Sequence, residues 1–321
     1  MISNKMKYNV GPLIYMPGLR NDIAEKIISF KNKRPLSVAI CLEDTIADDR
    51  VEEAHKNTLS QIYKLGQILE KENLSTDDIP SVFIRVRDAS QIKSVIAALG
   101  SDKELITGFI LPKIDDVTIR KYMSVIDSNR GSSFVYMPII ENSSLLQLAD
   151  RYRRLDSLNK DLLIIRPNIL NIRIGGNDFC KSQALRCSID HSIYDFAPIA
   201  SLLSDIAVTF NENFVVSAPV WNYFDTNTDD RWKSGMIAEI EKDKLNGFIG
   251  KTVIHPTQIA IVQECMKVSR SDYNDAMLLK NTSNNGILVV KGSNGNMLEH
   301  KTHMKWADKI IAMADAYGIK D

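Results

Sequence analysis

Two kinds of hydrophobic pattern alternate along this chain. Short runs that are apolar on both faces are typical of strands covered by helices on one side and by packed core on the other. Longer stretches between them carry apolar residues at helical spacing, as at Ile92, Val95, Ile96 and Leu99. The strand-like runs are Leu13–Met16, Ser37–Leu42, Val82–Val86, Gly108–Leu111, Phe134–Ile140, Leu170–Ile174, Phe214–Ala218 and Gly247–Ile254.

Eight strands that alternate with helices predict an α/β fold of the closed (β/α)8 TIM-barrel type. A doubly wound open sheet is the alternative, because periodicity does not establish closure. After the last run a helix is expected from Pro256, and the polar stretch Ser269–Asn285 predicts a linker. A small hairpin and a last helix at about Thr302–Tyr317 follow. We therefore expect a catalytic barrel over residues 1–268 and a linker with a hairpin-helix extension over 269–321, serving as a lid or in oligomerisation.

Composition narrows the class of protein. The 321 residues are 44% hydrophobic and 25% charged, as in ordinary globular proteins. Lys+Arg and Asp+Glu both total 40, so no net field favours nucleic acid or an anionic membrane. No apolar stretch approaches the roughly 20 residues of a membrane span. The four cysteines form no CxxC pair and the N-terminus has no signal-peptide core, which predicts a cytoplasmic location.

Glu141 and Asp178 are the most informative polar residues. Each follows the end of a strand-like run, and catalytic groups collect at the carboxyl ends of barrel strands. Two carboxylates that converge there can hold a hard cation such as Mg²⁺, with Mn²⁺ as the alternative ion. Helix N-caps or surface ion pairs are the structural alternative for both acids. We expect a metal site.

Arg85 lies inside an apolar strand, where an unpaired guanidinium is expensive to bury. A substrate carboxylate or alkoxide would give it a planar partner. Glu43 or Asp44 of the neighbouring strand could pair with it instead, and both contacts can coexist. Arg87 shares its strand face and, if it points inward, favours a polyanionic or phosphorylated substrate. Arg20 is a second candidate anion clamp, with a surface arginine as the alternative.

Short motifs stand at successive strand ends: Met16-Pro17-Gly18-Leu19-Arg20, Cys41-Leu42-Glu43-Asp44, Phe83-Ile84-Arg85-Val86-Arg87, Leu111-Pro112-Lys113, Ile139-Ile140-Glu141, Gly175-Gly176-Asn177-Asp178 and Gly247–Gln258. In this order, and over nearly the whole chain, they resemble the HpcH/HpaI aldolase/citrate lyase family, most closely its citrate lyase beta-subunit-like branch. The resemblance implies a Mg²⁺-dependent carbon–carbon bond lyase that acts on a hydroxy- or oxo-carboxylate. The reaction would be retro-aldol or retro-Claisen cleavage, or the reverse condensation.

The resemblance also implies roles for individual residues. Glu141 and Asp178 would hold Mg²⁺, Arg85 would stabilise the developing oxyanion, and Glu43 and Asp44 would orient that arginine. Glu299 would be the general acid/base, in its own site or in a neighbouring subunit's, and a trimer-based homo-oligomer is expected. A solvated hairpin charge is the alternative for Glu299, and packing beneath a loop is the alternative for Trp221. Substrate contacts are assigned to Arg20, Arg87, Lys113, Gly176, Pro219 and Trp221.

Three positions depart from the family pattern. Cys41 replaces an acid, Arg87 replaces Asn, and Glu299 replaces Asp. These departures leave the metal pair intact and leave open both the substrate and the use of coenzyme A. Two rival functions remain: a phosphoenolpyruvate/pyruvate-type enolate transferase that uses the same Mg²⁺, and a non-catalytic scaffold subunit of a biosynthetic complex. The complete carboxylate pair argues against the scaffold.

Overall fold

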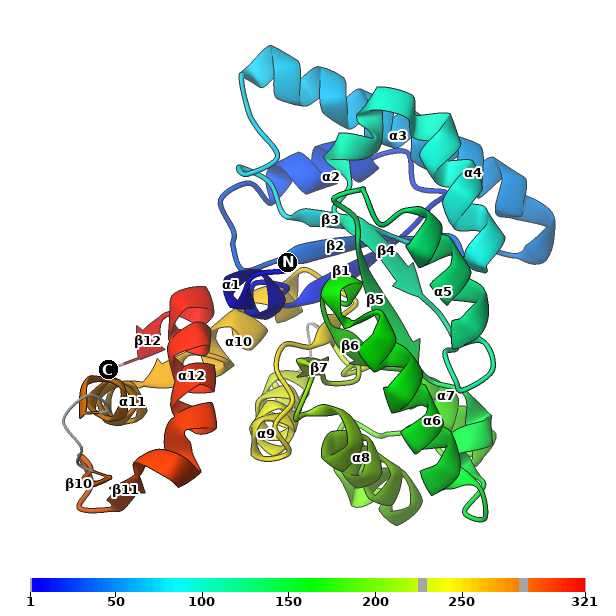
Figure 1. The fold of residues 1–321 in the computed structure, drawn as a ribbon. Coiled ribbons are helices and arrows are strands. Elements are labelled where there is room, and N and C mark those ends of the chain that lie inside the picture. Colours follow the sequence, from blue (N-terminus) through cyan, green and yellow to red (C-terminus); the bar gives the residue numbers. More distant parts are fainter. Residues whose placement is uncertain (1, 225–229, 283–287, 321) are drawn as a thin grey trace.

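The computed structural model describes residues 2–224, 230–282 and 288–320, and a parallel sheet of eight strands lies at its centre (Figure 1). Neighbouring strands pair in the order β7-β6-β5-β4-β3-β2-β1-β8. The strands are β1 Leu13–Pro17, β2 Ser37–Cys41, β3 Ser81–Arg85, β4 Gly108–Leu111, β5 Val135–Ile140, β6 Ile172–Ile174, β7 Val216–Ser217 and β8 Thr252–Val253. Each falls within or beside a run predicted from the sequence.

Hydrogen bonds between the β7 region and residues 249–251, which lead into β8, close the sheet into a barrel. Ala218 and Lys251 form a parallel bridge there. The backbone N–H of Ile249 donates to the carbonyl of Val216 at 2.8 Å, and Ser217 Oγ donates to the carbonyl of Ile249 at 2.6 Å. The predicted (β/α)8 barrel is thereby confirmed, and the open-sheet alternative is excluded.

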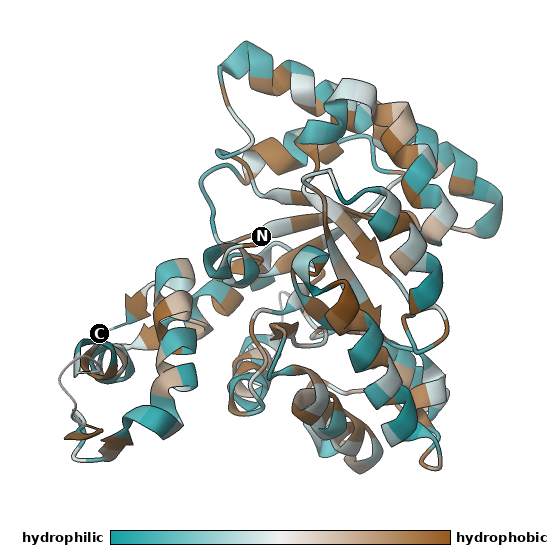
Figure 2. Cartoon of the chain, in the orientation of Figure 1, coloured by the Kyte–Doolittle hydropathy of each residue, from teal (hydrophilic) through white to brown (hydrophobic). Residues whose placement is uncertain are grey.

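Helices surround the strands, and brown and teal alternate along them in Figure 2, as expected where one helix face packs on the sheet. Within the described ranges, no helix has both the length and the apolar character needed to cross a membrane. The helices are α1 Asn4–Tyr8, α2 Ile23–Ser29, α3 Val51–Glu72, α4 Ala89–Leu99, α5 Ile119–Ser128, α6 Arg151–Ile164, α7 Gly176–Ser182, α8 Ala197–Phe210, α9 Arg231–Leu245, α10 Thr257–Cys265, α11 Arg270–Thr282 and α12 His300–Tyr317.

The barrel interior is divided into an apolar part and a polar part. Side chains alternate across a strand, and the outward residues of β6, β7 and β8 pack in the large core beneath the helices. Their inward neighbours are polar: Asn171 beside β6, Arg173 on β6, Ser217 on β7 and Thr252 on β8. The inward residues of β1 to β5 form a separate apolar core that includes Leu13, Ala39, Phe83, Ile110, Met137 and Ile139.

The C-terminal extension differs from the prediction in one element. Most of Ser269–Asn285, expected to be a linker, is helix α11 over Arg270–Thr282. Ala276 and Leu279 of this helix pack with Leu298 and Ala307 in a small core of their own. The expected hairpin is present as antiparallel strands β10, Val289–Lys291, and β11, Met297–Glu299, and α12 follows it.

The end of the extension returns to the barrel. Strand β12, Ile319–Lys320, pairs in parallel with β9, Val268–Ser269, directly after α10. Met313 and Tyr317 of α12 are buried in the large core. In Figure 1 the extension accordingly lies to one side of the barrel, joined to it through α10 and the end of α12.

A buried ion cluster joins helix α9 to the residue that precedes β8. Lys251 Nζ lies 2.8 Å from Glu239 Oε1 and 2.7 Å from Asp243 Oδ2, and all three side chains are almost fully buried. The second oxygens accept hydrogen bonds from the backbone N–H of Ile193 at 3.0 Å and from the hydroxyl of Tyr194 at 2.7 Å. Burial raises the pKa of Asp243 to about 6 against the opposing charge of Lys251.

We expect Lys251→Met to lower the free energy of unfolding by about 3–5 kcal/mol at pH 7, because it leaves two buried acids without a counter-charge. Protonation neutralises such acids, so the loss should be smaller at pH 5 than at pH 8. Urea unfolding at both pH values measures it. Lys242→Met, which breaks a half-exposed pair with Asp195, should change stability by less than about 1 kcal/mol. An equal loss for both variants would contradict the interpretation.

Candidate metal and substrate site

The carboxyl ends of the strands surround a cavity of about 250 Å³. Apolar lining comes from Ile139, Ile174 and Val220. The polar and charged residues that line it are Tyr15, Asp44, Thr45, Arg85, Glu141, Arg173, Asn177, Asp178 and Thr252. Acids, cations and hydroxyl groups from widely separated parts of the sequence therefore meet in one small space.

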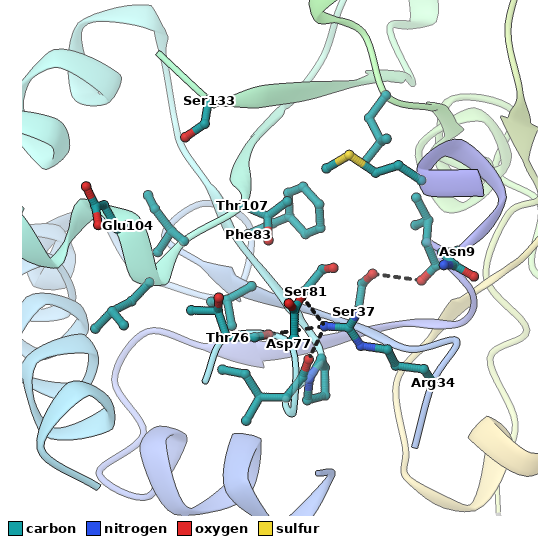
Figure 3. Close-up of a pocket in the computed structure, with 18 of the residues that line it drawn as sticks. Asn9, Arg34, Ser37, Thr76, Asp77, Ser81, Phe83, Glu104, Thr107 and Ser133 are labelled. Carbon is teal, nitrogen blue, oxygen red and sulfur yellow. Dashed lines mark hydrogen bonds and ion pairs between the residues drawn. The ribbon is translucent and has the colours of Figure 1, made fainter. Parts of the chain in front are cut away.

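A second cavity, of about 390 Å³, lies at the amino ends of the strands (Figure 3). Arg34 donates there to the backbone carbonyls of Thr76 at 3.1 Å and Ile79 at 3.0 Å. Ser37 Oγ donates to the carbonyl of Val10 at 2.7 Å. These polar groups are bound to backbone, which indicates that they stabilise loops. The carboxyl-end cavity is the stronger candidate, as in other barrels of this type.

Three carboxylates converge at the rim of the carboxyl-end cavity. Asp44 follows β2, Glu141 follows β5, and Asp178 lies in the first turn of α7. One oxygen from each residue lies within 4.8 Å of the others. Oxygen ligands at about 2.1 Å from Mg²⁺ are up to about 4.2 Å apart, so this spacing is close to that of a ligand set. The expected convergence of Glu141 and Asp178 is found, and Asp44 joins them.

Asp178 and Asp44 differ in the number of polar groups that bind their carboxylates. Within the described ranges, the Asp178 carboxylate has no hydrogen bond or ion pair. The Asp44 carboxylate binds the side chains of Arg85 and Lys113. The hard oxygen donors of all three acids suit Mg²⁺ or Mn²⁺. Asp178 is therefore the acid most available to an incoming ion.

Two glycines allow the start of α7 to pack closely against Glu141 and Pro219. A Cβ on Gly175 would overlap the Cβ and carboxylate of Glu141. A Cβ on Gly176 would lie 2.8 Å from Cβ of Pro219. Gly176 lines the cavity and Pro219 packs behind it, so these two predicted substrate-binding residues shape the wall.

Arg85, the last residue of β3, is the centre of the charge network. Its Nη2 lies 2.9 Å from oxygens of Glu43, Asp44 and Glu141. The guanidinium carbon is 5.8 Å from the centre of the Tyr15 ring. The expected pairing with Glu43 and Asp44 is found. Arg85 also lines the cavity, and its contact with substrate stays a prediction.

Lys113 holds the same acids from the other side. Its Nζ binds Glu43 and lies 3.0 Å from Asp44 Oδ1. Its backbone N–H donates to Glu141 Oε1 at 2.9 Å from a left-handed conformation with φ of 52°. A non-glycine residue in this region stores strain of order 1 kcal/mol or more, which is common at functional sites. Lys113 thus positions the acids in this structure.

The acids differ in their proton affinity. Burial raises the pKa of Glu141 to about 7; Arg85 opposes this shift and Asp178 adds to it. For Asp44 burial acts in the same direction, but its hydrogen bond to Glu43 and the charges of Arg85 and Lys113 outweigh it and lower its pKa to about 2. At neutral pH Asp44 is therefore ionised, and Glu141 is poised between its two forms.

Three predicted site residues, Glu43, Lys113 and Pro219, do not line the cavity but contact the residues around it. Four others lie outside the cavity and away from its acids. Arg20 is half-exposed and pairs with Asp22 at 2.6 Å. Arg87 pairs with Asp48 and lines a shallow surface depression beside α3. The expectation that Arg85 and Arg87 share one cationic pocket is therefore not met, because Arg87 lies beyond the last residue of β3.

Trp221 and Glu299 are the other two. Trp221 is buried, and its Nε1 donates to the carbonyl of Trp232 at 3.0 Å, which agrees with packing beneath the loop. Glu299 ends β11 in the extension and accepts a hydrogen bond from Thr302 Oγ1 at 2.7 Å. Its role as general acid/base in a neighbouring subunit stays a prediction.

The family model "C-C bond lyase of the TIM-barrel fold" matches residues 4–319. The chain belongs to that family. The expected resemblance to citrate-lyase-like proteins is confirmed, and so is the barrel. No curated protein sequence matches the chain significantly.

Solved structures share the fold of this C–C bond lyase family member. A citrate lyase from Burkholderia xenovorans has a TM-score of 0.69 and 13% identity, with 97% of this chain and 93% of that one covered. CitE from Mycobacterium tuberculosis, solved with magnesium, acetoacetate and coenzyme A, has a TM-score of 0.62 and 13% identity over 95% and 97%. RipC from Yersinia pestis has a TM-score of 0.53 and 16% identity over 81% and 95%. At these identities the likeness concerns the fold.

Sequence reasoning missed Arg173, Tyr15 and Thr252, which all line the cavity of this lyase-family barrel. Arg173 carried a signal, because it interrupts an apolar run in the way that Arg85 does. Tyr and Thr are common residue types in strands, so nothing in the sequence distinguishes Tyr15 and Thr252 from residues of the core.

We expect Gly175→Ala to weaken Mn²⁺ binding at least about tenfold, because the added methyl group displaces Glu141 and even outer contacts of metal ligands change affinity by 10–100-fold. Isothermal titration measures the affinity. Gly131→Ala is the matched control, since no atom lies within 4 Å of the added Cβ. Unchanged Mn²⁺ affinity in a folded Gly175→Ala protein would count against Glu141 as a ligand.

Proposed function

We propose that this protein is a Mg²⁺-dependent carbon–carbon bond lyase acting on a small hydroxy- or oxo-carboxylate. The observation that carries the proposal is the convergence of Asp44, Glu141 and Asp178 beside Arg85, at the catalytic end of a barrel from a C–C bond lyase family. Magnesium in the complexes of the M. tuberculosis proteins supports the choice of ion.

The residues at the rim fit the ion by charge and by donor type. Glu141 and Asp178 would hold it, with Asp44 as a third acid. When bound, Mg²⁺ supplies Lewis acidity to a chelated carboxylate and its adjacent oxygen. Arg85 and Lys113 keep the acids in place, because they share Glu43 and Asp44 between them.

Arg85 is the residue suited to the developing negative charge. Its Nε is buried and has no hydrogen-bond partner among the described residues, while its Nη2 is held by three acids. A guanidinium that is already oriented stabilises an oxyanion without reorganising during the reaction. Glu43 and Asp44 act through Arg85 as positioning residues.

The size of the cavity limits the substrate. A volume of about 250 Å³ lies just below the roughly 300–1,000 Å³ of common small-molecule sites. A compact acid fits, whereas coenzyme A would have to lie outside with only its acyl end in the cavity. Coenzyme A use, a trimer-based homo-oligomer and a cytoplasmic location stay predictions.

Metal affinity should depend on pH through Glu141. Burial raises the pKa of Glu141 to about 7. Below that pH the carboxyl group is mostly protonated, and it must lose its proton before it can bind an ion. We expect the apparent Kd for Mn²⁺ to rise toward tenfold per pH unit below about 7 and to level off above about pH 8. Titrations between pH 5.5 and 8.5 test this, and a constant Kd would show that Glu141 does not take part.

The lyase activity itself is tested with hydroxy-acids, oxo-acids and their coenzyme A esters, each with and without Mg²⁺. We expect carbonyl release that requires the ion and falls about 100-fold or more in Asp178→Asn, since several kcal/mol of Lewis-acid stabilisation are lost. Asp127→Asn, at an exposed pair with Arg130, should keep full activity. Transfer of a phosphoryl or acyl group without carbon–carbon cleavage would favour the enolate-transferase alternative.

A further inference from the structure

Arg173 is a buried cation without an anionic partner. Its exposed fraction is 1%. Among the described residues no carboxylate lies within ion-pairing distance. Its Nη2 donates to Thr252 Oγ1 at 2.9 Å and its Nη1 to Asn171 Oδ1 at 3.5 Å. Its Nε has no hydrogen-bond partner in the described part of the chain. Burial lowers its pKa to about 10, so the guanidinium is still charged at neutral pH.

An isolated buried charge is costly unless something compensates it. Arg85, in the same cavity, shows the usual solution, with three carboxylates around one guanidinium. Arg173 lacks this solution although both residues line the same space. An anionic group of a bound ligand would therefore supply the partner that Arg173 lacks.

Arg173 also lies deeper than the rim acids. It stands two residues before Gly175, the residue that contacts Glu141, which corresponds to about 6–7 Å along a strand. The neighbouring interior side chains on β7 and β8 are the hydroxyl residues Ser217 and Thr252, not apolar ones. A ligand held by its head at the rim would thus place its far end in a polar space beside Arg173.

We propose that Arg173 binds a second anionic group of the substrate, so that the cavity selects compact dianionic 2-hydroxy- or 2-oxo-acids over monoanionic ones. This rests on the proposed function, in which the first carboxylate is bound at the metal. The second group is a carboxylate or a phosphate, since a guanidinium binds either through paired N–H donors.

Isothermal titration in the presence of Mg²⁺ tests the proposal with three 2-hydroxy-acids: lactate, malate and 3-phosphoglycerate, each as both enantiomers. They share the metal-binding head and differ in the second anion. The proteins are the wild type, Arg173→Gln, Arg173→Lys and, as control, Arg120→Gln, an exposed arginine on α5.

We expect the wild type and Arg120→Gln to bind malate or 3-phosphoglycerate about 10- to 100-fold more tightly than lactate, the range for a charge-assisted hydrogen bond. Arg173→Gln should lose this preference while its affinity for lactate stays within about threefold. Its Tm should be unchanged or higher, because residues kept for binding are often unfavourable for stability. Whichever of malate and 3-phosphoglycerate binds more tightly identifies the second group.

Several results would overturn the inference. They are equal affinities for all three acids in the wild type, a preference that survives Arg173→Gln, or equal weakening of lactate and malate in that variant, which would put the single carboxylate on Arg173. Failure of both Arg173→Gln and Arg173→Lys to fold would assign Arg173 to the barrel itself.

The control for the underlying function is Mg²⁺ binding without acid. If the wild type binds Mg²⁺ and lactate but shows no preference for a second anion, only the inference about Arg173 fails. If it binds no Mg²⁺ at millimolar concentration, the proposed function fails and the inference falls with it.

Discussion

The arrangement at the barrel mouth depends on the contact between Arg85 and the acids that follow β2 and β5. Glu43, Asp44 and Glu141 would repel one another in a partly buried space, and one guanidinium reduces that repulsion because all three lie 2.9 Å from its Nη2. The contact also spans three strand ends, so it fixes the acids relative to the barrel. Of these acids and Asp178, Asp178 alone has no cationic partner among the described residues, and this asymmetry agrees with the proposed metal site.

Much of this could be predicted from the sequence, because strand ends are defined by short-range patterns. Eight apolar runs fix eight strands, and in a closed parallel barrel the residues that follow them meet at one end. Glu43, Asp44, Arg85, Glu141 and Asp178 are therefore brought together as expected. Arg87 is not, since β3 ends at Arg85 and the alternation of side chains ends with it. Trp221 follows β7 in a loop, where its indole N–H binds a carbonyl of α9.

The remaining differences have two physical causes. Helix α11 has a polar sequence because it packs mainly on a small core formed with β11 and α12, so it needs only a narrow apolar face. A search for hydrophobic runs does not single out Arg173, because one charged residue hardly changes the hydrophobicity of the run around it. A charge within a buried strand is as costly at Arg173 as it is at Arg85.

The division of the barrel interior has a consequence for how such a protein can diversify. The apolar filling from β1 to β5 supports the scaffold, and the acids stand after the strands, above it. Asn171, Arg173, Ser217 and Thr252 occupy positions where an exchange alters the floor without moving those acids. Proteins that descend from one ancestral barrel can therefore change their substrate specificity through a few side chains on three adjacent strands. The acids at the strand ends need not change.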